Sequence, residues 1–258
     1  MGRVLVTVTV HDRKYLIDAI LFDKDGTLID FASLWLAWLD ALLDTLGETV
    51  AVPIQRSDLA SAVGADLISR THDAGGPLAV GSNSEVRLVL AQRLYMSGLR
   101  WEQACAAVES ASRIVDTWLS EEALIDPAAG VLDFIGQARE LGVRMGVVTA
   151  DDQDRTLRHL HLLGLQDSIE VVIGADTVSS GKPDPEGVLL ACRRLGVAPE
   201  RTLLVGDTSS DMAAATAAGL ATGIRLGGAG PDDELLFSGN GSIPLHRVER
   251  FEEVSITP

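Results

Sequence analysis

The sequence predicts an α/β fold, a doubly wound parallel sheet with an all-helical domain inserted into it. An unbroken apolar run, Ala19–Phe22, is typical of a strand buried on both faces of a parallel sheet. From residue 126 onward, short apolar strands alternate with amphipathic helices. Between these parts, residues 31–125 show helical periodicity. We therefore expect a core made of residues 1–30 and 126–258, and a helical insert made of residues 31–125.

Two strands are predicted before the insert, over residues 4–10 and 16–22, with the polar residues 11–14 as the turn between them. The first strand has neither the basic head nor the cleavage site of a signal peptide. A hairpin beside a central strand fits a parallel sheet poorly. Two alternatives stay open: the first strand lies elsewhere, or it pairs with a second subunit in a homodimer.

The insert begins with a helix from Phe31 that Gly47 is expected to stop. A second helix carries Leu59, and a third follows the cap signal at Ser82. A fourth helix starts near Trp101. The glycine-rich residues 73–81 interrupt this block.

After the insert, the pattern is helix, strand, helix, strand. The predicted helices cover residues 130–141, 154–163, 185–195 and 210–218. The predicted strands cover residues 145–148, 171–173, 202–205 and 221–224. In such sheets ligands bind beyond the carboxyl ends of the strands. The tail from Gly227 receives no function.

Polar residues follow four of these strands directly or after a loop. They are Asp23, Asp25, Thr149, Lys182, Asp207 and Asp211, and the apolar Ala150 directly follows Thr149. Clustered carboxylates cannot all stay ionised without a counter-charge, and oxygen ligands favour Mg²⁺ over zinc. Lysine suits a phosphoryl oxygen, so this inventory fits phosphoryl transfer. Simpler interpretations stay open for single residues: a turn at Asp25, and a favourable helix start at Asp211.

These four segments, in this order, resemble the four motifs of the haloacid dehalogenase-like hydrolases, which have a Rossmann-like core. Residues 181–185 and 205–207 are especially similar to the phosphoglycolate phosphatase-like branch. The resemblance implies that Asp23 attacks phosphorus and that Asp25 exchanges protons with the leaving group and water. It implies that Thr149, Ala150 and Lys182 bind the phosphate. It also implies a metal site formed by Asp23, the backbone carbonyl of Asp25, Asp207 and Asp211, and a cap formed by residues 31–125.

Two positions depart from the family pattern. Ala150 stands where many relatives carry asparagine, which changes one hydrogen bond to substrate or phosphate. Lys24 stands between the two aspartates, where relatives often carry an apolar residue. Its ammonium either points away or adds positive charge near the site, and both alternatives stay open.

Charge and cysteine content limit the partners. The chain has 258 residues, with 21 basic and 37 acidic side chains, for a net charge of −16. We expect neither a nucleic-acid nor a membrane partner, because both favour a basic face. Two cysteines, Cys105 and Cys192, suit no disulfide framework, which favours the cytoplasm.

The function predicted is a magnesium-dependent phosphatase acting on a small phosphorylated metabolite, such as phosphoglycolate or a sugar phosphate. A phosphomutase of the same superfamily and a non-catalytic phospho-acceptor module are the alternatives. A dehalogenase would not need Asp25, and a phosphonate-cleaving relative would need a lysine in the insert, where none occurs.

Overall fold

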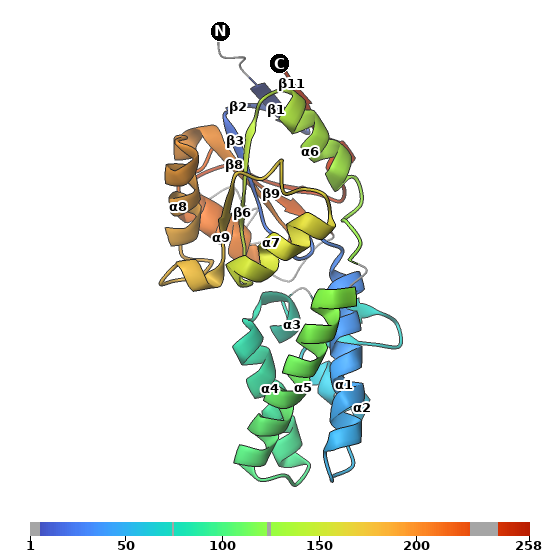
Figure 1. Cartoon of the computed structure of the whole chain (residues 1–258). Coiled ribbons are helices and arrows are strands. Elements are labelled where there is room, and N and C mark those ends of the chain that lie inside the picture. The colour runs from blue at the N-terminus through green and yellow to red at the C-terminus, as the bar shows by residue number, and fades with distance from the viewer. Residues whose placement is uncertain (1–5, 74, 123–124, 228–241) are drawn as a thin grey trace. The chain divides into compact units, whose positions relative to one another are not determined.

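The computed structural model describes residues 6–73, 75–122, 125–227 and 242–258 (Figure 1). The chain divides into two compact units: Met1–Asp30 with Asp126–Pro258, and Phe31–Ile125. Among the described residues, no helix combines the length and the apolar character needed to cross a membrane.

A parallel sheet lies at the centre of the first unit, in the order β10-β9-β8-β3-β6-β7. Its strands are β3 (Ala19–Phe22), β6 (Arg144–Val148), β7 (Val171–Ile173), β8 (Thr202–Gly206), β9 (Thr222–Leu226) and β10 (Leu245–Val248). Every pairing in it is parallel. β3 lies between β6 and β8 with all its side chains buried, which explains its apolar run. The predicted α/β class is confirmed.

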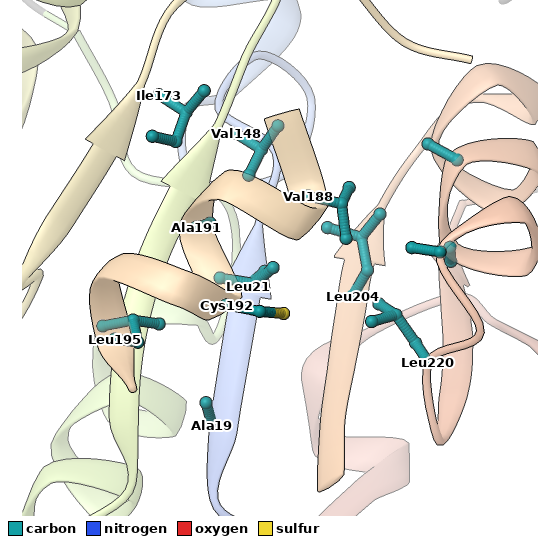
Figure 2. Packing of buried hydrophobic residues seen from close by; sticks show 13 residues of the cluster. Ala19, Leu21, Val148, Ile173, Val188, Ala191, Cys192, Leu195, Leu204 and Leu220 are labelled. Atoms are coloured by element: carbon teal, nitrogen blue, oxygen red, sulfur yellow. The ribbon is translucent and has the colours of Figure 1, made fainter. Parts of the chain in front are cut away.

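Helices cover both faces of this sheet. They are α6 (Val131–Glu140), α7 (Gln153–Leu162), α8 (Glu186–Leu195) and α9 (Ser209–Ala217), and short 3₁₀ turns occupy Ala175–Thr177, Pro199–Arg201 and Phe251–Glu253. Figure 2 shows the core on one face, where Leu21 of β3 belongs to one cluster with Val188 and Leu195 of α8. On the opposite face, Phe22 packs edge-on against Phe134 of α6, with ring centroids 6.2 Å apart. Successive side chains of β3 thus face different helical layers.

The N-terminal strands form a separate antiparallel sheet, in the order β11-β1-β2. Its strands are β1 (Val6–Val10), β2 (Arg13–Ile17) and β11 (Val254–Thr257). β1 has a neighbour on each side. The alternative in which this strand pairs with a second subunit at an open edge is therefore wrong, because β2 and β11 occupy both of its edges.

The single strand predicted over residues 16–22 is also wrong. The chain leaves one sheet at Ile17 and enters the other at Ala19. Asp18 lies between them, and its carboxylate pairs with Arg201 at 2.7 Å. This ion pair holds the crossing point against the amino edge of β8, so one run of strand-forming residues serves two sheets.

The second unit is mainly helical. It contains a π-helical turn (Ala32–Leu36), α1 (Ala37–Thr49), α2 (Arg56–Ala62), α3 (Pro77–Val80), α4 (Asn83–Met96), α5 (Trp101–Glu122) and the two-residue strands β4 (Ala65–Asp66) and β5 (Thr71–His72). The helix from Phe31 passes Gly47 and continues to Thr49, so glycine does not stop it. The β4–β5 hairpin is a small departure from the all-helical prediction. Ser82 caps α4 through a reciprocal bond with Glu85, as its sequence predicts.

Candidate active site

The loop that follows β3 carries the first two predicted aspartates. Asp23 comes directly after the strand, and its backbone N–H still donates to the carbonyl of Val205 on β8, 2.8 Å away. Asp23 is buried, whereas the side chain of Asp25 is 19% exposed. Gly26 then turns the chain with a φ of +80°, a conformation that favours glycine. The strand and this turn fix both aspartates at the carboxyl edge of the sheet.

Lys182 connects two of the predicted carboxylates. Its Nζ donates to Oδ1 of Asp23 at 2.6 Å and to Oδ1 of Asp211 at 2.5 Å. Burial alone would lower the pKa of this lysine, but the carboxylates of Asp211 and Asp23 raise the pKa of Lys182 above its ordinary value. Lys182 therefore remains a cation, as its predicted role requires.

The start of α9 holds Asp211. Oγ1 of Thr208 accepts the backbone N–H of Asp211 at 3.2 Å. In return, Oδ2 of Asp211 accepts the backbone N–H of Thr208 at 3.1 Å and its hydroxyl at 2.5 Å. A Cβ on Gly206 would lie 2.4 Å from Cγ of Asp211, so glycine leaves the room that this carboxylate occupies. With Lys182 at Oδ1, both oxygens of Asp211 have donors.

Asp23, Asp207 and Asp211 form a compact group of carboxylates, with one oxygen of each within 4.8 Å of the others. Burial raises the pKa of Asp23 to about 7 against the opposing charge of Lys182, and the charge of Asp211 adds to the rise. Burial and repulsion from Asp23 also raise the pKa of Asp207 well above its ordinary value. One lysine does not balance this negative charge. An all-oxygen donor set with excess negative charge fits a hard divalent cation such as Mg²⁺.

The side chain of Asp25 does not belong to this group of carboxylates. Its Oδ1 instead accepts a hydrogen bond from Nζ of Lys24 at 2.7 Å. The resemblance implies that the backbone carbonyl of Asp25 serves the metal and that its side chain exchanges protons, and both roles stay predictions.

Thr149 and Ala150 follow β6, the neighbour of β3. Thr149 is buried, its N–H donates to the carbonyl of Ile173 at 3.0 Å, and its Oγ1 accepts the N–H of Asp151 at 3.1 Å. Ala150 is exposed. Within the part of the chain that the structure describes, no hydrogen bond or ion pair joins Thr149 to Asp23 or Lys182. Their joint action on a phosphate stays a prediction, which rests on the adjacency of β3 and β6.

Sequence reasoning missed a second buried charge cluster beside the aspartates. Lys24 is completely buried, and its Nζ lies 3.0 Å from Oδ2 of Asp151 and 3.2 Å from Nδ1 of His159. Neither Asp151 nor His159 is among the residues that the sequence predicts for the site. The scarcity of lysine was the available signal, since only Lys14, Lys24 and Lys182 occur in the chain and two of them lie here.

Arg225 was missed as well. It is buried in β9, and its Nε donates to the backbone carbonyl of Asp207 at 3.1 Å. A charged side chain within a run of strand residues was the signal, but the predicted strand ended at Ile224. Arg225 supports the backbone of the loop that presents Asp207.

The sequence model of the haloacid dehalogenase-like hydrolases matches residues 17–219. The chain belongs to this family. The match includes the strand ends that carry the predicted residues, and it assigns the chain to a family of hydrolases.

Curated relatives and solved structures support the family. A phosphoglycolate phosphatase of Pseudomonas aeruginosa is 27% identical over 78% of this chain, although the match spans only 66% of that relative. Pyrophosphatase PpaX of Bacillus velezensis is 29% identical over 80% of this chain and 82% of the relative. A HAD-superfamily hydrolase from Geobacter sulfurreducens has the same fold, with a TM-score of 0.62, 22% identity and coverage of 92% and 94% of the two chains.

Proposed function

We propose that this chain is a magnesium-dependent phosphatase that hydrolyses a small phosphorylated metabolite through an aspartyl-phosphate on Asp23. The observation that carries the proposal is the contact of Lys182 with both Asp23 and Asp211, inside a group of three carboxylates of which these two are buried. Such a group combines a nucleophile, a fixed cation and a site for a divalent ion. The names of the curated relatives support phosphoglycolate as a candidate substrate and add pyrophosphate.

In the first step, an oxygen of Asp23 attacks phosphorus and the bond from phosphorus to the substrate oxygen breaks. Asp25 gives its proton to that leaving oxygen. Lys182 and Thr149 hold the phosphoryl oxygens, and Lys182 neutralises charge that develops on them. Ala150 contributes its backbone at the same strand end.

In the second step, water attacks the phosphorus of the aspartyl-phosphate and gives a proton to Asp25. The bond between phosphorus and the Asp23 oxygen breaks, which releases phosphate and restores the carboxylate. Asp25 thus alternates between acid and base, and no proton is left over.

Asp23, Asp207 and the backbone carbonyl of Asp25 would hold the Mg²⁺ ion, which supplies charge stabilisation for the transferring phosphoryl group when bound. Asp211 already accepts hydrogen bonds at both oxygens. We therefore assign it an indirect role, in which it orients Lys182 and reaches the ion through water.

We further propose that residues 31–125 act as a cap that excludes water during the first step and contacts the rest of the substrate. Cys105 and Cys192 are free cysteines, which favours a reducing compartment, and the cytoplasm is the proposed location.

The test is release of free phosphate from a panel that includes phosphoglycolate, sugar phosphates, a nucleotide and pyrophosphate. We expect Mg²⁺-dependent release by the wild type, and loss of release with chelator and in Asp23→Asn. Asp18→Asn is the matched control, because it makes the same change at the opposite end of β3. Full activity of Asp23→Asn would contradict the proposal, and an isomerised product that requires a bisphosphate and releases no phosphate would favour a phosphomutase.

A further inference from the structure

We propose that Lys24 is a positioning residue that fixes the carboxyl group of Asp25 for proton transfer. The inference rests on the proposed function, because Asp25 exchanges protons only if the chain is a phosphatase or mutase. It goes beyond that function by assigning a role to a side chain that lies between the two catalytic aspartates and touches no reacting atom.

The surroundings of Lys24 are unusual for a lysine. The side chain is completely buried, and burying an ammonium is costly unless several acceptors surround it. Three acceptors lie within 3.2 Å of Nζ: Oδ1 of Asp25, Oδ2 of Asp151 and Nδ1 of His159. The ammonium makes hydrogen bonds with Asp25 and His159, and it pairs with Oδ2 of Asp151 by charge, without a hydrogen bond.

The two partners other than Asp25 hold Lys24 in place. Oδ1 of Asp151 accepts a hydrogen bond from the backbone N–H of Asp152 at 2.9 Å. The backbone N–H of Asp151 donates to Oγ1 of Thr149. His159 projects from α7, and burial, followed by the charge of Lys24, lowers its pKa to about 3. The ring is thus neutral and can accept a hydrogen bond from the ammonium. Lys24 is anchored to the loop and the helix that follow β6.

The two buried lysines each contact two of the aspartates near the site. Lys182 contacts Asp23 and Asp211, while Lys24 contacts Asp25 and Asp151. The nucleophile and the proton-transfer group are therefore oriented by different cations on different loops. Lys24 also ties the loop of Asp25 to the loop of Thr149, so it fixes the direction of one carboxyl group relative to the phosphate-binding strand end.

The experiment measures Lys24→Met with two classes of substrate. An aryl phosphate, p-nitrophenyl phosphate, has a leaving group that needs no proton, whereas an alkyl monophosphate needs one. We expect the first step with the aryl phosphate to stay within about threefold of wild type, and the second step, which needs Asp25 as base, to slow by about 100-fold. Rapid mixing should thus show a stoichiometric burst of p-nitrophenolate followed by slow turnover.

With the alkyl phosphate, the released alcohol should show no burst, because the first step also needs the proton of Asp25. The kcat should fall by about 100-fold without a rise in KM. Asp25→Asn should give the same pattern. Arg201→Met is the matched control, because it removes the cation of another aspartate pair, the one at the amino end of β3. It should leave both steps within about threefold of wild type.

Lys24→Met removes the nearer of two cations from the buried carboxylate of Asp151 and leaves Arg155 at 3.6 Å, so the variant can fail to fold. Lys24→Met with Asp151→Asn removes both charges, and we expect it to melt near the wild-type temperature and to keep the burst with slow turnover. Equal loss of both steps with both substrates, in a folded variant, would overturn the inference. So would recovery of alkyl phosphate turnover in the double variant, since Lys24 would then only neutralise Asp151. A wild type that hydrolyses neither substrate would overturn the proposed function, and this inference with it.

Discussion

Gly26 shows how one missing side chain makes room for a neighbouring carboxylate. A Cβ at this position would lie 2.1 Å from Oδ2 of Asp207, and the residue has a φ of +80°. The turn after Asp25 and the carboxylate after β8 therefore occupy adjoining space. Oγ1 of Thr27 lies 3.4 Å from the other oxygen of Asp207, so the same turn also donates a hydrogen bond to it.

We predict that Gly26→Ala lowers phosphatase activity by about 100-fold, because Asp207 must move to accommodate the methyl group. Gly142→Ala is the control: its φ is +72° and no atom would lie within 4 Å of its Cβ. Both variants should lose about 1 kcal/mol of stability through the backbone alone. Steady-state kinetics at several Mg²⁺ concentrations and urea unfolding separate the two effects. Equal activity of the two variants would contradict this account.

The site residues divide into those that sequence could predict and those that it could not. Asp23 and Asp207 end apolar strands, so topology brings them to one edge whatever the side chains do. The contact between Lys24 and Asp151 depends on how two loops face each other, and no local pattern encodes that. Arg225 was missed because the predicted strand ended at Ile224, two residues before the end of β9.

At the scale of elements, two helices begin with the same device and serve different ends. Ser82 and Glu85 form a capping box on α4, and Thr208 and Asp211 form one on α9. The first stabilises a helix of the insert. The second does so while it also holds the carboxylate that binds Lys182.

We predict that Ser82→Ala and Thr208→Ala each cost about 1 kcal/mol of stability, since each removes a helix cap. Thr208→Ala should in addition lower kcat by roughly tenfold, because Asp211 loses the hydroxyl that orients it. Thermal unfolding and phosphate release measure the two quantities. A Ser82→Ala variant with an equal loss of kcat would show that the caps act only through stability.

The two sheets of the first unit meet through a histidine. His246 of β10 and Tyr15 of β2 share a hydrogen bond of 2.6 Å between the hydroxyl and Nε2. Burial, followed by the charges of His11 and Arg13, lowers the pKa of His246 to about 4 from an ordinary 6.5. As pH falls below 6.5, the unfolded chain binds a proton that the folded protein does not take up until about pH 4.

Stability that is present above pH 6.5 should therefore be lost as the pH falls toward 4. We predict that His246→Gln reduces the stability difference between about pH 7 and about pH 4.5 by roughly 2 kcal/mol, after allowance for solvent screening. Urea titrations at the two pH values measure it, with the exposed His161→Gln as control. An unchanged difference in His246→Gln would refute the assignment.

The sheet crossing at Asp18 marks the limit of pattern reasoning at this scale. Residues 13–22 contain no glycine or proline, and β2 and β3 both end in apolar residues that suit strands, Tyr15–Ile17 and Ile20–Phe22. Nothing local separates one strand from two. The partners decide, since β2 pairs only with β1 in the described residues and β3 pairs with β6 and β8.

For the whole molecule, the site is a place where function opposes stability. Asp23 and Asp207 lie beside the buried Asp211, and the raised pKa values of Asp23 and Asp207 mean that this group of carboxylates destabilises the fold when no cation neutralises it. An ion that binds only the folded state would oppose this destabilisation. It would add about 2.7 kcal/mol to the free energy of unfolding at a free ion concentration of about a hundred times Kd.

We predict that Asp207→Asn, measured with chelator, is more stable than the wild type by roughly 1 kcal/mol, because it removes repulsion from Asp23. Mg²⁺ should raise the melting temperature of the wild type but not of this variant. Asp167→Asn, an exposed substitution, should change neither result. Equal stabilisation of Asp207→Asn by Mg²⁺ would place the ion elsewhere.

The two segments that connect the insert to the first unit are joined to each other by backbone contacts. The N–H of Asp30 donates to the carbonyl of Asp126 at 2.9 Å, and Ile29 bridges to Pro127 beside it. Residues 31–125 therefore form a loop whose two ends are held together by the backbone of the first unit. We expect that another insert could replace residues 31–125 if its two ends met at the same backbone contacts. The strands of the parallel sheet would then keep their register.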